Sequence, residues 1–202
     1  MPSAARDPRA ALHRRLQALA MKLVEPGTVA RAHDVLNFVF LYRPQEELLL
    51  RDALPGFQQA LAEHGRRGVL ISLAATMEEV LDGGGWMKGI AAREPRSGLR
   101  AANDTIAHLL AHGPDSLEAR VRKRIEGLDA TRDVALLHRA GALFPAYRTS
   151  ALMAHLEGLD VPVVLFFPGR SEPPNGLSFM GRASADSQYR AEILPDDGGP
   201  AE

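Results

Sequence analysis

The segment VPVVLFFPG, residues 161–169, decides how the rest of the chain is interpreted. It is an unbroken apolar run that stops at Pro168-Gly169, which is typical of a strand buried on both faces. Amphipathic helical patterns separate it from three earlier short apolar runs, and this alternation predicts parallel strands covered by helices. The three earlier runs are LNFVFLY (36–42), GVLISLA (68–74) and DVALLHRAG (133–141).

The expected fold is an α/β three-layer sandwich with a mainly parallel sheet. Segments 177–182 and 189–194 alternate weakly, and we expect them to form a C-terminal antiparallel edge hairpin around ASADS. The Pro168-Gly169 pair is interpreted as the turn that leaves the last parallel strand, and SEPPNG as the loop that follows.

We expect a single α/β domain over 36–194, in which 82–132 is a helical insertion. An N-terminal helix within 1–35 packs on this domain, and 195–202 form a disordered tail.

Helix signals give the remaining boundaries. The first helix is predicted over 8–24, with Asp7 as its cap and Pro8 at its first position. A helix over 45–65 contains Pro55, which should break or kink it. Thr76 and Glu79 have the spacing of a capping box, and an irregular segment pinned by Trp86 is predicted at 82–89. Two helices are predicted over 99–127, divided at 112–116 with Asp115 or Ser116 as cap. A further helix is predicted over about 147–157.

Composition excludes several classes of protein. The chain has 202 residues, 46% of them hydrophobic, a formal net charge of -1 and no cysteine, so it can bury a core but has no disulfide or thiolate site. No apolar stretch reaches the about 18 residues of a membrane span, and no signal-peptide core is visible. The sequence therefore predicts a soluble, cytoplasmic protein.

Arginines gather where the predicted parallel strands end, which is where open α/β sheets usually bind ligands. Arg43, Arg139 and Arg170 follow three of the strands, and Arg148 lies on the next helix. They are either an anion site or solvated and salt-bridged loop residues. His138, at the end of a buried strand, is either a base or a hydrogen-bonded structural histidine.

Catalytic and metal motifs are missing from the sequence. There is no phosphate-binding G-x-x-x-x-G-K-[ST], no G-x-G-x-x-G and no G-x-S-x-G. His108 and His112 have helical spacing but lack the glutamate of zinc hydrolases and a third ligand. The basic run 120–124 is flanked by Glu118 and Glu126, which favours a solvated helix face over a nucleic-acid site. We therefore expect no catalytic residue, no metal and no cofactor.

Several segments carry a family resemblance. They are FVFLYRPQEELLLRDALPGFQQALAEHG, VALLHRAGALFPAYRTSALMAHLEGLDVPVVLFFPG and GLSFMGRASADSQYRAEIL, within 36–81 and 133–194. Their order and spacing resemble the BrxB family of bacteriophage exclusion (BREX) systems. The matching positions are Gly141, Phe144, Pro145 and Arg148, then Phe166, Pro168 and Gly169, then Tyr189, Arg190 and Ala191. Phe167 departs from the tyrosine that the family often has there, which weakens any ligand role for a hydroxyl at this position.

The resemblance implies a non-catalytic component of a BREX defence complex that binds the alkaline-phosphatase-like protein PglZ. The alternative is a module that binds phosphate, nucleotide or nucleic acid through the strand-end arginines; an enzyme that uses His138 is a third class. Arginine and aromatic side chains are favoured at interfaces. The candidate residues for contact with a partner or an anion are Arg43, Arg139, Phe144, Tyr147, Arg148, Arg170 and Arg190.

Overall fold

The structure is a computed structural model that describes residues 7–25, 37–113, 115–172, 176–180, 182, 189 and 191–194. Its strands are β1 (Asn37–Tyr42), β2 (Arg67–Ser72), β3 (Asp133–His138), β4 (Val163–Glu172), β5 (Gly176–Phe179) and β6 (Glu192–Leu194). Its helices are α1 (Pro8–Val24), α2 (Glu47–Glu63), α3 (Leu73–Gly83), α4 (Trp86–Ala111), α5 (Leu117–Glu126) and α6 (Thr149–His155), with short 3-10 helices at Pro44–Glu46 (η1) and Ala140–Leu143 (η2).

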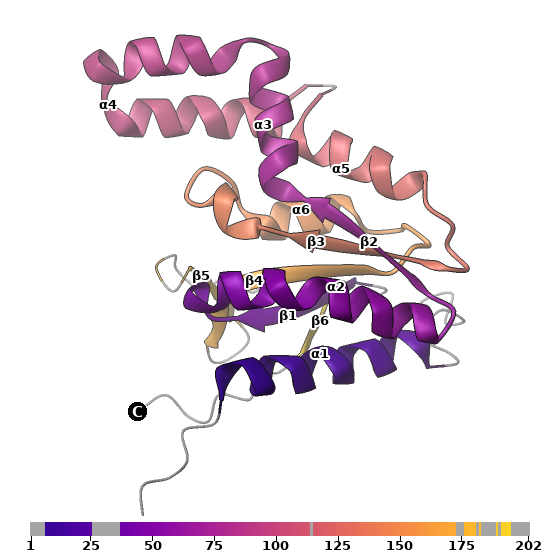
Figure 1. Cartoon of the computed structure of the whole chain (residues 1–202). Helices are drawn as coiled ribbons and strands as arrows, with labels where there is room; N and C mark the ends of the chain where they lie inside the picture. Colours follow the sequence, from indigo (N-terminus) through magenta and orange to yellow (C-terminus); the bar gives the residue numbers. More distant parts are fainter. Residues whose placement is uncertain are drawn as a thin grey trace, which may run out of the picture.

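The central sheet has the strand order β2-β3-β4-β1-β6, and all of these neighbours are parallel. Helices α1 and α2 cover one face, and α3, α5 and α6 cover the other (Figure 1). The predicted α/β three-layer sandwich is therefore confirmed.

Alternate side chains of β1, β3 and β4 enter two separate cores. Phe38 and Phe40 of β1 pack with Phe166 of β4 under α1 and α2, whereas Val39 of β1 and Phe167 of β4 pack under the other helices. A strand that is buried on both faces has no polar positions, which explains why its sequence reads as a continuous apolar run.

The first helix begins as predicted, because the Asp7 side chain accepts a hydrogen bond from the backbone N–H of Arg9 and Pro8 occupies the first turn. The Ser116 cap of α5 is also confirmed, with its hydroxyl accepting from the N–H of Ala119. Among the helices that the structure describes, none is both long enough and apolar enough to span a bilayer.

The predicted break at Pro55 is wrong. Helix α2 continues through this residue from Glu47 to Glu63. Proline removes the hydrogen bond to the carbonyl four residues earlier, that of Arg51. Both Pro55 and Arg51 are exposed, so water can satisfy the freed carbonyl without interrupting the buried face of the helix.

The capping box at Thr76 and the irregular segment at 82–89 are also wrong. Ser72 is the cap of α3, and Thr76 lies inside that helix with its hydroxyl donating to the Ser72 carbonyl. The interruption after α3 is limited to the turn at Gly84 and Gly85, because Gly85 has a positive φ of 65° that reverses the chain within one turn. Helix α4 then starts directly at Trp86.

The end of the fourth strand differs from the prediction. Strand β4 continues past Pro168-Gly169, leaves its parallel partners and pairs with β5 in antiparallel register, Gly169 opposite Phe179. A Cβ at position 169 would lie 2.2 Å from the Ser178 carbonyl oxygen, so only glycine permits this close approach. The Pro-Gly pair therefore transfers β4 to a new partner instead of ending it.

The antiparallel hairpin thus consists of β4 and β5. Residues 192–194 do not pair with β5 as expected; they form β6, which pairs parallel with β1. The predicted ASADS turn and the tail at 195–202 lie outside the described residues. The domain boundaries at 35 and 194 stay predictions.

Asp133, at the start of β3, is a fully buried carboxylate that ties β3 to β2. It accepts hydrogen bonds from Arg67 Nε at 2.8 Å and from the backbone N–H of Asp129 at 3.0 Å. The hydrogen bonds from Arg67 hold the pKa of Asp133 at about 2, below the ordinary range of an aspartate.

The Asp133→Asn substitution is expected to lower the free energy of unfolding at pH 7 by about 1–3 kcal/mol, because it removes a buried carboxylate that accepts hydrogen bonds from the partly exposed Arg67 and from the backbone of Asp129. A lowered folded-state pKa stabilises the native protein above the unfolded pKa of about 4, and this contribution is lost as the pH falls toward 2. The variant should therefore lose less stability than the parent between about pH 5 and about pH 3.

Urea unfolding at both pH values measures this difference. The matched control is Asp160→Asn, since Asp160 is exposed, and it should change stability by less than about 0.5 kcal/mol. An Asp133→Asn protein with an unchanged acid dependence would contradict the assignment.

Candidate functional site

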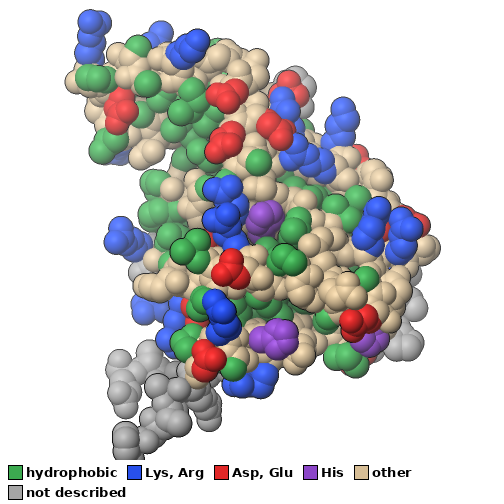
Figure 2. All heavy atoms as spheres, in the orientation of Figure 1, with side chains coloured by type: hydrophobic (Ala, Val, Ile, Leu, Met, Phe, Trp, Pro, Cys, Tyr) green, Lys and Arg blue, Asp and Glu red, His purple; other side chains and the backbone are tan. Residues whose placement is uncertain are grey.

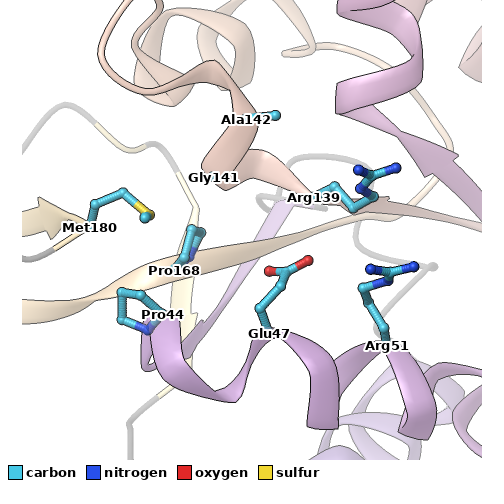
Figure 3. A pocket seen from close by; sticks show the side chains of 8 residues that line it. All are labelled: Pro44, Glu47, Arg51, Arg139, Gly141, Ala142, Pro168 and Met180. Atoms are coloured by element: carbon cyan, nitrogen blue, oxygen red, sulfur yellow. The ribbon is translucent and has the colours of Figure 1, made fainter.

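A hollow of about 270 Å³ lies where the parallel strands end, and we call it the strand-end hollow. It is formed where η1 and the first turns of α2 face η2 across the end of the sheet (Figure 3). Its lining residues are Pro44, Glu47, Arg51, Arg139, Gly141, Ala142, Pro168 and Met180. The carboxyl edge of the sheet therefore does form a concave site, as expected for an open α/β fold.

Arg139 reaches this hollow because of an uncommon backbone conformation. It follows the last residue of β3 and has φ 60° and ψ 35°, the left-handed region that non-glycine residues seldom adopt. The chain turns there from the strand into η2, and Arg139 lines the hollow on the side opposite α2 (Figure 3).

Glu47 and Arg51 lie one helical turn apart near the start of α2, and both side chains point toward the segment that carries Arg139 (Figure 3). The Tyr42 hydroxyl, at the end of β1, donates a hydrogen bond to the Glu47 carboxylate. Burial, followed by this hydrogen bond, raises the pKa of Tyr42 above its ordinary value. Tyr42 therefore remains a neutral donor that fixes Glu47 at the wall of the hollow.

His138, the last residue of β3, lies beside this group of charges. Its Nδ1 atom is buried and has no hydrogen-bond partner among the residues described. Burial lowers the pKa of His138; Glu47 opposes this effect, and Arg139 and Arg51 add to it. The ring is thus neutral near pH 7, and the sequence prediction of a hydrogen-bonded strand-end histidine is not met at Nδ1.

The guanidinium groups of Arg51 and Arg139 have no ion-pair partner within 4.0 Å in the described part of the chain. Two such groups on opposite walls, beside a neutral histidine, can accept an anionic group, since arginine presents a fixed fork of donors to carboxylate and phosphate.

The structure brings only one of the predicted contact residues, Arg139, into the hollow. Arg43 and Arg148 are exposed, and Arg170 is exposed and pairs with Glu172 at 3.1 Å. Phe144 is half-buried, with its ring 5.6 Å from that of Phe179. Arg190 lies outside the described residues.

Tyr147 belongs to the core and not to the exposed part of 141–148. It is buried, and its hydroxyl donates a hydrogen bond to Glu118 of α5. Burial raises the pKa of Tyr147, and Glu118 adds to this effect. Tyr147 therefore joins α5 to the segment before α6.

Glu47 and Arg51 were not predicted from the sequence, because only the residues that directly follow each strand were considered as site residues. Both lie in the helix after those residues. One signal was present: a charged pair four residues apart begins directly after an apolar strand and its Pro44 turn. The partnership of Glu47 with Tyr42 depends on tertiary placement and had no sequence signal.

The basic run 120–124 is largely neutralised within the fold. Arg120 lies 3.5 Å from Glu79 of α3, Arg122 lies 2.8 Å from Glu126, and Arg124 also pairs with Glu79. The run was predicted to be a solvated helix face, and the structure shows that three of its arginines are held in ion pairs.

His138 is expected to titrate below about 6.5, the ordinary value for histidine. Two-dimensional NMR of the imidazole nitrogens against pH measures this, and His138→Gln identifies the resonance by its loss. A midpoint for His138 at or above about 6.5 would contradict burial as the dominant influence.

A search of curated proteins and a search of solved structures each returned no match. The model of the family described as BREX protein BrxB matches residues 69–194, which is more than half of the chain. This range includes 82–132, where the sequence resemblance was limited to helical character, and leaves out the first resembling strand. The chain therefore belongs to the BrxB family and is a component of BREX phage defence.

Proposed function

We propose that this protein is a non-catalytic adaptor of a BREX assembly and that it binds a partner protein, the PglZ-like protein of the same system. Membership of the BrxB family supports a role alongside other BREX components. The observation that carries the adaptor role is helix α4, which contributes little to the fold.

Helix α4 is a helical hairpin that projects from the sandwich (Figure 1). The backbone leaves helical geometry at Gly98, with φ 81° and ψ 164°, so the element consists of two arms, 86–97 and 99–111. Leu110 is its one fully buried residue, and Ile106 packs partly against the core. The second arm thus anchors the hairpin, and the first arm extends beyond the core.

The hairpin exposes large apolar side chains, although burying them would stabilise the folded protein. Trp86 is 50% exposed, Met87 is 43% exposed and Leu99 is 69% exposed. Figure 2 shows hydrophobic side chains gathered over this projecting lobe. Contiguous exposed apolar surface is typical of a protein interaction site, and tryptophan is enriched among interface residues that dominate affinity.

The adaptor proposal is tested by affinity purification of the tagged protein after co-expression with the PglZ-like protein of its own BREX system. We expect the two to co-elute in a defined ratio from size exclusion at low salt, because the exposed apolar surface loses contact with water in the complex. Tagged protein without the partner is the control for nonspecific retention. Separate elution of two folded proteins would overturn the adaptor role.

The strand-end hollow favours a second function, the binding of an anionic group. Support comes from Arg51 and Arg139, which line the hollow and have no ion-pair partner within 4.0 Å among the described residues. Phosphate esters, including those of nucleotides and nucleic acids, are the class of ligand that this chemistry suits.

Thermal unfolding in inorganic phosphate, nucleotides, duplex DNA and RNA tests this second function. We expect a Tm that rises with ligand concentration and a rise that weakens as salt increases. Arg51→Gln with Arg139→Gln should remove the rise, whereas Arg170→Gln, which changes an arginine already paired with Glu172, should keep it. An equal response in the double variant would remove the hollow from consideration.

A further inference from the structure

A groove runs between the two arms of the hairpin, and we call it the α4 groove. Its volume is about 980 Å³, larger than that of the strand-end hollow. Each arm has about a dozen residues, which makes the groove about 18 Å long at the rise of an α-helix. It is lined by Gly84, Gly85, Trp86, Gly89, Ile90, Arg93, Ser97, Ala101, Ala102, Asp104, Thr105, His108 and Leu109.

One end of the groove has an apolar wall shaped by glycine. The Trp86 ring lies so close to Gly84 that a Cβ on residue 84 would be 1.9 Å from Trp86 Nε1. Ile90 follows Trp86 one turn later, and both line the groove. On the opposite arm, Ala101 and Ala102 have short side chains. A molecule in the groove can therefore approach the backbone of this arm closely.

The arms carry an excess of positive charge with no partner in the fold. Residues 86–111 contain two acidic residues, Glu94 and Asp104, and four basic ones, Lys88, Arg93, Arg96 and Arg100. In the part of the chain that the structure describes, none of these four cations makes an ion pair within 4.0 Å.

Helix α5 is also rich in arginine, but its arginines form ion pairs within the fold. The arginines of α5 are paired with Glu79, Asp115 and Glu126. The fold thus neutralises one basic helix and leaves the hairpin positive. Within the groove lining Arg93 is balanced by Asp104, and the excess cations of the arms, Lys88, Arg96 and Arg100, lie outside that lining. Charge complementarity with these arms favours an acidic occupant, and the apolar wall favours one whose groove-facing side is hydrophobic.

We infer that the α4 groove binds an acidic amphipathic helix of the partner protein. This inference rests on the proposed adaptor function and assigns its contact surface. The apolar face of the helix packs on Trp86 and Ile90, and its carboxylates meet Arg93 and the neighbouring basic residues. Two arms and a third helix then form a three-helix arrangement, which is the helix-in-groove mode of recognition.

The test measures the affinity of the complex with the PglZ-like protein for two groove variants, each with a matched control. Trp86→Ala is compared with Met21→Ala, since Met21 of α1 is 53% exposed. Arg93→Glu is compared with Arg14→Glu, an equal charge change on an exposed residue of α1. We expect both groove variants to raise Kd by about tenfold or more and both controls to change it by less than about twofold.

Two further readouts test the chemistry of the occupant. The Kd of the parent should rise with salt, and this dependence should be weaker for Arg93→Gln, because a charge contact is lost. Trp86 is the one tryptophan of the chain, so 5-fluorotryptophan gives a single 19F signal, which should shift on addition of the partner. Circular dichroism and urea unfolding should match the parent for all variants, since these side chains lie outside the core.

The outcomes separate this inference from the function on which it rests. A parent protein that forms no complex with the PglZ-like protein overturns both. A complex that both groove variants form with parental affinity overturns the α4 groove alone and leaves the adaptor role standing. Dimerisation of the isolated parent that Trp86→Ala abolishes, measured by light scattering, assigns the groove to a second copy of this chain and overturns the acidic partner.

Discussion

The burial of β4 on both faces is the constraint on which the rest of the structure depends. This strand lies between β3 and β1, so both of its edges are paired and both of its faces are covered. Phe166 packs with the rings of Phe40 and Phe57 on one face, while Phe167 contacts Phe179 and Tyr189 on the other. Helices on both sides are required to keep these rings from water, which makes a three-layer arrangement the solution that fits this sequence.

The same strand also organises the candidate sites. At Pro168 it reaches the wall of the strand-end hollow, and one residue later it changes partner from the parallel sheet to β5. The hollow is therefore built on rigid elements, with α2 supplying Glu47 and Arg51. In contrast, the α4 groove stands outside both cores and has few contacts that fix it. The proposed anion site therefore lies on elements of the sandwich, and the proposed protein contact lies on the projecting hairpin.

The sequence predicts the sandwich well because its signals are local. Apolar runs locate the first four strands, and the Asp7 and Ser116 caps locate two helix starts. The predictions were wrong where the decisive contact is between distant segments. The pairing of Gly169 with Phe179 and of β6 with β1 depends on which edge is open after folding, and no periodicity within 163–194 encodes that choice.

The candidate functional residues also divide into those with a local sequence signal and those placed only by tertiary contacts. Arg139 was predicted because it directly follows a strand, whereas its neighbours in the hollow come from a helix that packs there only in the folded protein. Tyr147 looked like a contact residue because aromatic side chains favour interfaces, but its position under α5 buries it. The start of the first arm, 86–89, was predicted to be irregular because of the glycines around it, although the turn before the hairpin is limited to Gly84 and Gly85.

The loose attachment of the hairpin has a consequence for how such systems diverge. Substitutions on the first arm change few packing contacts of the sandwich, so their effects on folding are small and nearly additive with changes elsewhere. In the proposed complex, the contact residues of this arm can therefore change without a compensating change in the core.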